Sequence, residues 1–122
     1  MNISKPYNLE ERLAVFAEQT IDIVKHIKVT QINKRIISQL VASTGSSGAN
    51  YCEANEAEST KDFVHKIGIV KKELKESMHW LRLLARANPE KADDVRRDWR
   101  EAKELLLIFS KIRNSAKRGL EK

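Results

Sequence analysis

Residues 59–89 read STKDFVHKIGIVKKELKESMHWLRLLARANP and predict one long amphipathic α-helix. Apolar and small side chains recur there at steps of three and four residues, within about 60° of one line along the helix. Ser59 or Thr60 is placed to accept a hydrogen bond from a free N–H at the helix start. Asn88 ends the helix, because the following proline disfavours a helical conformation at the preceding residue. The predicted inward stripe is Phe63, Ile67, Val70, Leu74, Ser77, Leu81 and Leu84.

Three other segments predict helices that pack against this one, which covers residues 59–88. Asn8 and Glu11 match a capping box before a helix over 9–28. A second helix is expected over 32–56, and Pro89 opens another over 90–118. The predicted inward side chains are Leu9, Leu13, Phe16, Ala17, Thr20, Val24 and Ile27 in the first helix, Ile32, Ile36, Leu40, Ser43 and Ser47 in the second, and Val95, Trp99, Ala102, Leu106, Phe109 and Ala116 in the last.

Short connections between these segments predict antiparallel neighbours. The composition agrees, because only four Gly and two Pro interrupt a chain of 122 residues that is 41% hydrophobic and 33% charged. A chain of this length can bury one core. We therefore predict an all-α protein that forms a single up-down-up-down antiparallel four-helix bundle, one domain over residues 1–122.

The segment Ala42 to Ala49, ASTGSSGA, allows two interpretations. Two glycines with several Ser and Thr favour a loop by helix propensity alone. Small side chains also let two helix backbones approach closely, and the apolar period resumes on both sides of the segment. We therefore expect a packed helix, with a kink near Gly45 or Gly48.

No apolar run is long enough to cross a membrane, and Met1 to Tyr7 lack the hydrophobic core of a signal peptide. We expect a cytoplasmic protein without a membrane partner. Its one cysteine, Cys52, fits a reducing compartment and is expected to be unreactive.

The formal net charge of +6 permits contact with nucleic acid without requiring it. In an antiparallel bundle the end of the first helix and the start of the second share a pole, where four cations gather: Lys25, Lys28, Lys34 and Arg35. They are the candidate nucleic-acid contact, and a solvated basic end is the alternative. A second basic group, Lys111, Arg113, Lys117, Arg118 and Lys122, is expected at the opposite pole, where Glu53, Glu56 and Glu58 offset its charge.

No residue pattern predicts catalysis, a metal site or a cofactor. Glu76 and His79 match half of a di-iron pattern, but Asp62 and His65 lie roughly 21 Å away on the same helix and cannot complete it. Cys52 has no activating neighbour at helical spacing. A hydrogen-bonded cluster of Asn50, Glu53 and Glu73 with Lys61 is one interpretation of these polar residues, and exposure to water is the other. We expect no enzyme and no small-molecule substrate.

A second apolar set lies away from the main stripes of the two longest helices: Ile69, Trp80, Leu83, Leu105, Ile108 and Ile112. A single core-facing stripe should be narrower. Exposed apolar patches mark partner surfaces, so this set is the candidate oligomer interface, and a wider core is the alternative.

Residues 48–84, GANYCEANEAESTKDFVHKIGIVKKELKESMHWLRLL, resemble the four-helix-bundle family named for the 23S ribosomal RNA intervening-sequence protein. The similarity extends in pattern from about Leu9 to Arg118. The commoner pattern of the family has a proline in its second helix and a glycine after the position of Glu53. This chain lacks both, as a GANY-type subgroup does. The motif residues are Asn50 and Glu53, Lys61 and Phe63, and Glu73 with Leu74.

This resemblance implies a homopentamer of bundles with no assigned catalytic residue. Accessory proteins of diversity-generating retroelements resemble the family in fold, and they bind a reverse transcriptase and RNA through basic surfaces. We therefore expect a non-catalytic homo-oligomer with an accessory role that involves RNA or a nucleic-acid enzyme. The alternative is a protein-interaction scaffold with no nucleic-acid partner.

Overall fold

The structure, a computed structural model, describes residues 8–121. The predicted lack of a signal core in Met1 to Tyr7 and the basic Lys122 lie outside the described residues. Within them the chain forms four α-helices and one turn of 3-10 helix, and no strand, which confirms the all-α prediction. The helices are α1, Leu9–Lys25, α2, Lys34–Asn55, α3, Thr60–Ala87, and α4, Ala92–Leu120, and the 3-10 turn is η2, Pro89–Lys91.

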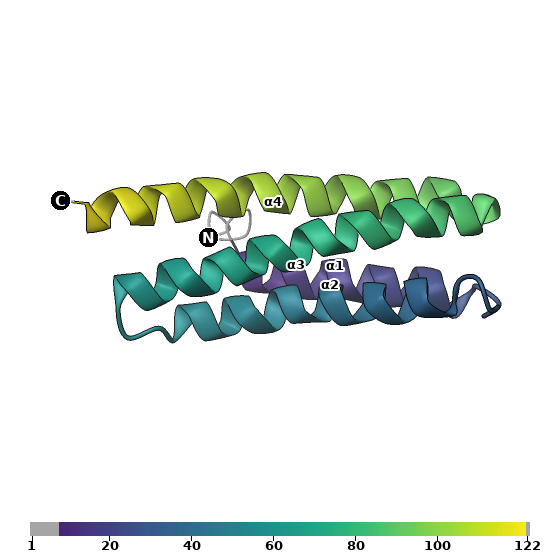
Figure 1. Cartoon of the computed structure of the whole chain (residues 1–122), viewed down its shortest axis with the longest axis horizontal. Helices are drawn as coiled ribbons and strands as arrows, with labels where there is room; N and C mark the ends of the chain where they lie inside the picture. The colour runs from purple at the N-terminus through teal and green to yellow at the C-terminus, as the bar shows by residue number, and fades with distance from the viewer. Residues whose placement is uncertain (1–7, 122) are drawn as a thin grey trace.

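The four helices lie side by side along one axis, and successive helices are joined at alternate ends (Figure 1). α3 packs along α2 on one side and along α4 on the other, while α1 closes the bundle against α2 and α4. α1 is the shortest at 17 residues, and α3 and α4 have 28 and 29. Because the connections alternate between the two ends, the α1–α2 connection and η2 lie at the same end of the bundle (Figure 1).

Local hydrogen bonds account for the helix boundaries. The Asn8 side chain accepts a bond from the Glu11 N–H, and the Ser59 hydroxyl accepts one from the Asp62 N–H, both 3.1 Å long. Ser59 is thus the cap of α3, a choice that the sequence left open between two residues. Asn88 ends α3, as predicted, and η2 delays the start of α4 to Ala92.

The core stripe of α3 agrees with the prediction except at its start, where Val64 is buried and Phe63 only half-buried. The predicted stripe of α4 is confirmed at Val95, Ala102 and Phe109, which are buried, and is wrong at the two positions between them. Trp99 and Leu106 are half-buried, whereas the deepest positions of α4 are Val95, Asp98, Ala102, Leu105 and Phe109. The sequence pattern misleads because one of these five positions is a carboxylate, which a hydrophobic period assigns to the surface.

The small-residue segment is part of an uninterrupted α2, which confirms the packed-helix interpretation. Ser43 and Ser47 are buried, and their hydroxyls bond to carbonyl groups one turn earlier, at Leu40 and Thr44. The Ser43 hydroxyl also lies 2.8 Å from the Ser77 hydroxyl of α3. Small polar side chains can be buried here because each finds a hydrogen-bond partner.

The start of the predicted second helix was wrong. Ile32 lies before α2 and is 77% exposed, while the neighbouring Asn33 is buried. Asn33 takes the inward position because its side-chain amide forms hydrogen bonds with Thr30, Lys28 and Asn88.

Candidate functional site

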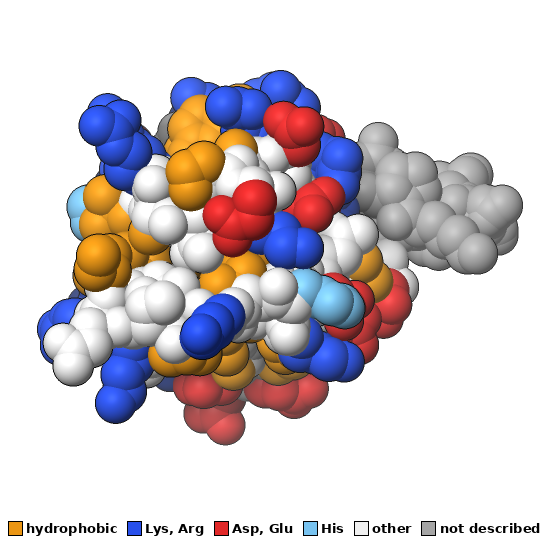
Figure 2. Space-filling model, turned by 90° about the vertical axis from the view of Figure 1, so that its right-hand side faces the viewer, with side chains coloured by type: hydrophobic (Ala, Val, Ile, Leu, Met, Phe, Trp, Pro, Cys, Tyr) orange, Lys and Arg blue, Asp and Glu red, His pale blue; other side chains and the backbone are white. Residues whose placement is uncertain are grey.

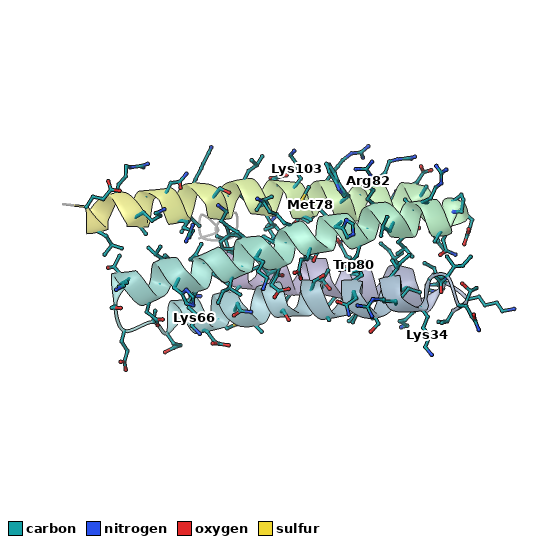
Figure 3. The ribbon with its side chains drawn as sticks, viewed as in Figure 1. Lys34, Lys66, Met78, Trp80, Arg82 and Lys103 are labelled. Carbon is teal, nitrogen blue, oxygen red and sulfur yellow. The ribbon has the colours of Figure 1, made fainter. Side chains whose placement is uncertain are left out.

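The basic pole, Lys25, Lys28, Lys34 and Arg35, lies where α1 ends and α2 begins. All four side chains are exposed. In residues 8–121 none of them pairs with a carboxylate. Lys34 lies at this end of the bundle in Figure 3. The structure therefore brings the predicted candidate contact residues to one end of the molecule, exposed and without an ion pair.

A buried amide holds this end in one conformation. The Asn33 side chain accepts a 2.7 Å hydrogen bond from the Thr30 N–H and donates a 3.0 Å bond to the Lys28 carbonyl. It also donates to the Asn88 side chain across the bundle, over 3.1 Å. The connection between α1 and α2 is thus tied both to itself and to the end of α3, so the cations beside it stand on a fixed support.

The surface of this end is mixed in character. Figure 2 looks onto it and shows Lys and Arg side chains around its edge, with Asp and Glu side chains and apolar groups among them. In the first turn of α4, Asp93 and Asp94 pair with Arg96 and Arg97. Two apolar side chains lie between Lys28 and Lys34 in the sequence: Val29 is 58% exposed, and Ile32 is more exposed still.

A second basic surface, which sequence reasoning did not single out, lies between α3 and α4 toward the other end. We call it the basic groove; it is lined by His65, Gly68, Ile69, Lys71, Lys72, Lys75, Glu76 and Arg113. It thus has four cations and one carboxylate. The pKa of Lys71 is lowered, first by burial and then by repulsion from Arg113, Lys75 and Lys117.

Arg113 of α4 is seated directly over Gly68 of α3. Its Nε–H donates a 3.1 Å hydrogen bond to the Val64 carbonyl. A methyl group at position 68 would lie 3.1 Å from this Nε and 3.2 Å from Cζ and Nη2. Glycine costs helix stability at a central position, so its place in α3 is explained by the room it leaves for the guanidinium group.

The predicted neutralisation of the α4 terminus by the α2–α3 turn is not seen. Glu53 pairs with Lys66 of α3 at 2.8 Å. No ion pair within the described residues joins Glu53, Glu56 or Glu58 to the α4 cations. Long cationic side chains on α3 reach the turn first, because α4 borders α3 and not the end of α2.

Of the two interpretations of Asn50, Glu53, Glu73 and Lys61, the hydrogen-bonded cluster does not form. The Asn50 side chain donates to the Ser46 carbonyl one turn earlier in α2, and Glu53 is taken by Lys66. Lys61 is exposed. Glu73 is half-buried, and its pKa is raised first by burial and then by Glu76. Of the remaining motif residues, Leu74 is buried and Phe63 packs on the core, so both serve the fold.

The candidate oligomer interface does not form one exposed surface. Leu105 has no exposed area and belongs to the core, so it was wrongly assigned. Trp80, Ile108 and Ile112 are half-buried and pack against that core, and Ile69 lines the basic groove. Trp80 lies beside Gln39 of α2, and Met78 lies between α3 and α4 (Figure 3). Leu83 remains 37% exposed, and the sequence missed Leu107, which is 54% exposed.

A polar network, half-buried at Arg12 and Glu101 and buried at Thr20 and Asp98, joins α1 to α4. Arg12 donates to both carboxylate oxygens of Glu101, over 2.8 and 2.9 Å, and lies 2.9 Å from Glu104. Deeper in the bundle the Thr20 hydroxyl bonds to Asp98, whose other carboxylate oxygen has no partner within residues 8–121. Burial raises the pKa of Asp98 to about 6, although Thr20 lowers it and Glu101 raises it further.

In the described part of the chain no three His, Cys, Asp or Glu side chains come together as a metal site would require. Cys52 is exposed, and its pKa is raised by partial burial and by the nearby Glu10. Among residues 8–121, none of the helices has the length and apolar character to cross a bilayer.

Comparison with known proteins gives a family and one solved fold. The family model described as 23S rRNA-intervening sequence protein matches residues 10–111. A crystal structure from Bacteroides thetaiotaomicron VPI-5482, described as a protein with unknown function from the S23 ribosomal protein family, is 26% identical, with a TM-score of 0.72. The match covers 84% of this chain and 95% of that one. No curated protein matches the sequence.

Proposed function

The chain belongs to the family of 23S rRNA-intervening sequence proteins, and we propose that it acts as a non-catalytic, homo-oligomeric accessory protein that associates with RNA. The basic pole carries this proposal. Lys25, Lys28, Lys34 and Arg35 are exposed and without ion pairs in the described chain, on and beside a connection held by the Asn33 amide. Because the backbone of this connection is held in one conformation, binding a polyanion orders less of the chain and has a lower entropic cost.

The expected mode of binding is contact with the phosphate backbone. No Phe, Tyr or Trp lies among residues 25–35, so extensive stacking on bases is not expected. Each neutralised phosphate releases counterions, which makes such binding weaker at higher salt and indifferent to sequence. The protein is expected to act in the cytoplasm, where RNA is available.

Assembly into a homo-oligomer multiplies these contacts. The family resemblance favours five subunits, and closed symmetry would gather five copies of the basic pole into one ring. Leu107 and Leu83 are large exposed apolar side chains on α4 and α3 that a subunit contact would cover. Sedimentation at micromolar concentration should give a mass near five times 14.0 kDa. A monomer at that concentration would contradict this part of the proposal.

An electrophoretic mobility shift with a structured RNA tests the RNA association. Wild type should shift the RNA at low salt and more weakly at physiological salt. A variant with Lys25, Lys28, Lys34 and Arg35 changed to Glu should lose the shift. The matched control changes Lys61, Arg82, Arg100 and Lys103 to Glu; these residues are also exposed and lie outside the basic pole and the basic groove. Equal loss in both variants would show that net charge and not the basic pole governs binding.

One observation favours a protein-interaction scaffold as the second candidate function. Val29 and Ile32 stand exposed between the cations on a fixed connection, and rigid exposed apolar groups are typical of protein contacts. If wild type does not shift RNA even at low salt, the scaffold is the better assignment. A Val29→Ser and Ile32→Ser double variant then serves to map the partner.

A further inference from the structure

The basic groove between α3 and α4 combines charge, shape and a fixed donor. Lys71, Lys72, Lys75 and Arg113 line it, and Glu76 is its one carboxylate. None of the four cations has an ion pair in the part of the chain that the structure describes. The groove is therefore a cluster of positive charge drawn from two helices, with more cations than carboxylates.

The cations of the groove disfavour one another. Arg113, Lys75 and Lys117 all lower the pKa of Lys71, after burial, which has the largest effect. Clustered like charges raise the free energy of the folded chain, and an anion bound among them would relieve the repulsion. None of these four side chains belongs to the hydrophobic core.

Arg113 is held in position and is not a freely moving surface cation. Its Nε–H is committed to the Val64 carbonyl of α3, which fixes the plane of the guanidinium group. Gly68 provides the space in which that group lies. Gly68 of α3 thus leaves room for an arginine from another helix, and the arginine is held in one orientation there. Such preorganisation is typical of a binding site.

We propose that the basic groove is a binding site for a phosphate group, held by Arg113 with Lys71, Lys72 and Lys75. A phosphate presents oxygens in several directions, so one group can accept bonds from the guanidinium fork of α4 and from ammonium groups of α3 together. A planar carboxylate faces one way and satisfies fewer of them. The site is distinct from the basic pole, and it does not rest on the proposed association with RNA.

The test is a titration of the full-length protein with inorganic phosphate, followed by heteronuclear NMR at low ionic strength. Wild type should show saturable shifts at the Ile69 amide and the Arg113 Nε–H, and sodium chloride of equal ionic strength should not reproduce them. Arg113→Gln should weaken phosphate binding about tenfold, the loss expected for one charge-assisted contact. Arg100→Gln removes the same charge from an exposed position of α4 outside the groove and should bind like wild type.

Gly68→Ala separates the geometry of the site from its charge. The added methyl group must displace the Arg113 guanidinium, so phosphate affinity should fall while net charge stays constant. The melting temperature is measured alongside, because alanine favours the helix more than glycine while the crowding of Arg113 acts against it. The proposal is overturned if wild type shows no saturable shift, or if Arg113→Gln and Arg100→Gln bind phosphate equally well.

A competition experiment identifies the source of the phosphate. A structured RNA that displaces inorganic phosphate from the groove would assign it to a nucleic-acid backbone. A nucleoside triphosphate that competes where RNA does not would assign it to a free phosphorylated compound. Either result supports the phosphate site.

Discussion

Replacing the buried Asp98 by asparagine should stabilise the protein at neutral pH. Asp98 is 3% exposed and has one carboxylate oxygen without a partner in residues 8–121. The Thr20 hydroxyl has a single proton and two acceptors, Asp98 and the Phe16 carbonyl 3.1 Å away. When Asp98 is ionised, this proton can serve only one of them. A protonated Asp98, or an asparagine, can donate to Thr20 and leave the Thr20 proton for Phe16.

The magnitude follows from the pKa of Asp98, which burial raises from 3.8 to about 6. Each pKa unit is worth about 1.4 kcal/mol, so ionising Asp98 costs the folded state roughly 3 kcal/mol. Between these two pKa values the folded chain holds a proton that the unfolded chain has released. The free energy of unfolding therefore falls as pH rises through this window. The free-energy cost of the buried Asp98 carboxylate is fully present above the folded-state pKa of about 6 and absent below the unfolded-state pKa of 3.8.

Chemical denaturation from pH 3.5 to pH 7.5 measures this difference. Asp98→Asn should exceed wild type by up to roughly 3 kcal/mol in the free energy of unfolding at pH 7, and the excess should shrink toward pH 4. Other carboxylates titrate in both proteins, so their effects cancel in the difference. Thr20→Val, which removes the hydroxyl from Asp98, should instead destabilise the protein most at neutral pH. An Asp98→Asn variant that is less stable at pH 7, or whose difference does not change with pH, would refute the reasoning.

Two further variants test the core and the α1–α2 connection. Leu105→Ala should lower the free energy of unfolding by about 2–5 kcal/mol in a urea titration of the dissociated chain, because Leu105 is fully buried. Leu107→Ala, on the exposed face of α4, should change it by no more than about 0.5 kcal/mol. Similar losses in the two variants would contradict the burial of Leu105 and the exposure of Leu107. Asn33→Asp keeps the acceptor for the Thr30 N–H but places a carboxylate oxygen against the Lys28 carbonyl and the Asn88 side-chain oxygen. It should lower the free energy of unfolding by about 1–3 kcal/mol and speed hydrogen exchange at the Thr30 amide. Unchanged exchange would mean that other contacts hold the connection.

Much of the candidate site could be anticipated from local sequence, and its most specific feature could not. The four cations of the basic pole lie within eleven residues, so any antiparallel bundle brings them together. The basic groove joins Gly68 to Arg113, and the polar network joins Arg12 to Glu101. Such pairs depend on the rotation of one helix against another, which no single helix encodes in its own periodicity.

The sequence by itself determined the local features of this protein. Its apolar period, caps and single proline stop specify four helices, their approximate ends and the buried face of α3, because each depends on interactions within a few residues. Only the tertiary structure decided that Asp98 and Leu105, and not Trp99 and Leu106, take the deepest positions of α4, and which polar groups meet there. A hydrophobic period places Asp98 at the surface, and it is buried because the Thr20 hydroxyl stands opposite it, 78 residues away in the chain. The free energy of burying a polar group depends on such a partner, and only packing supplies it.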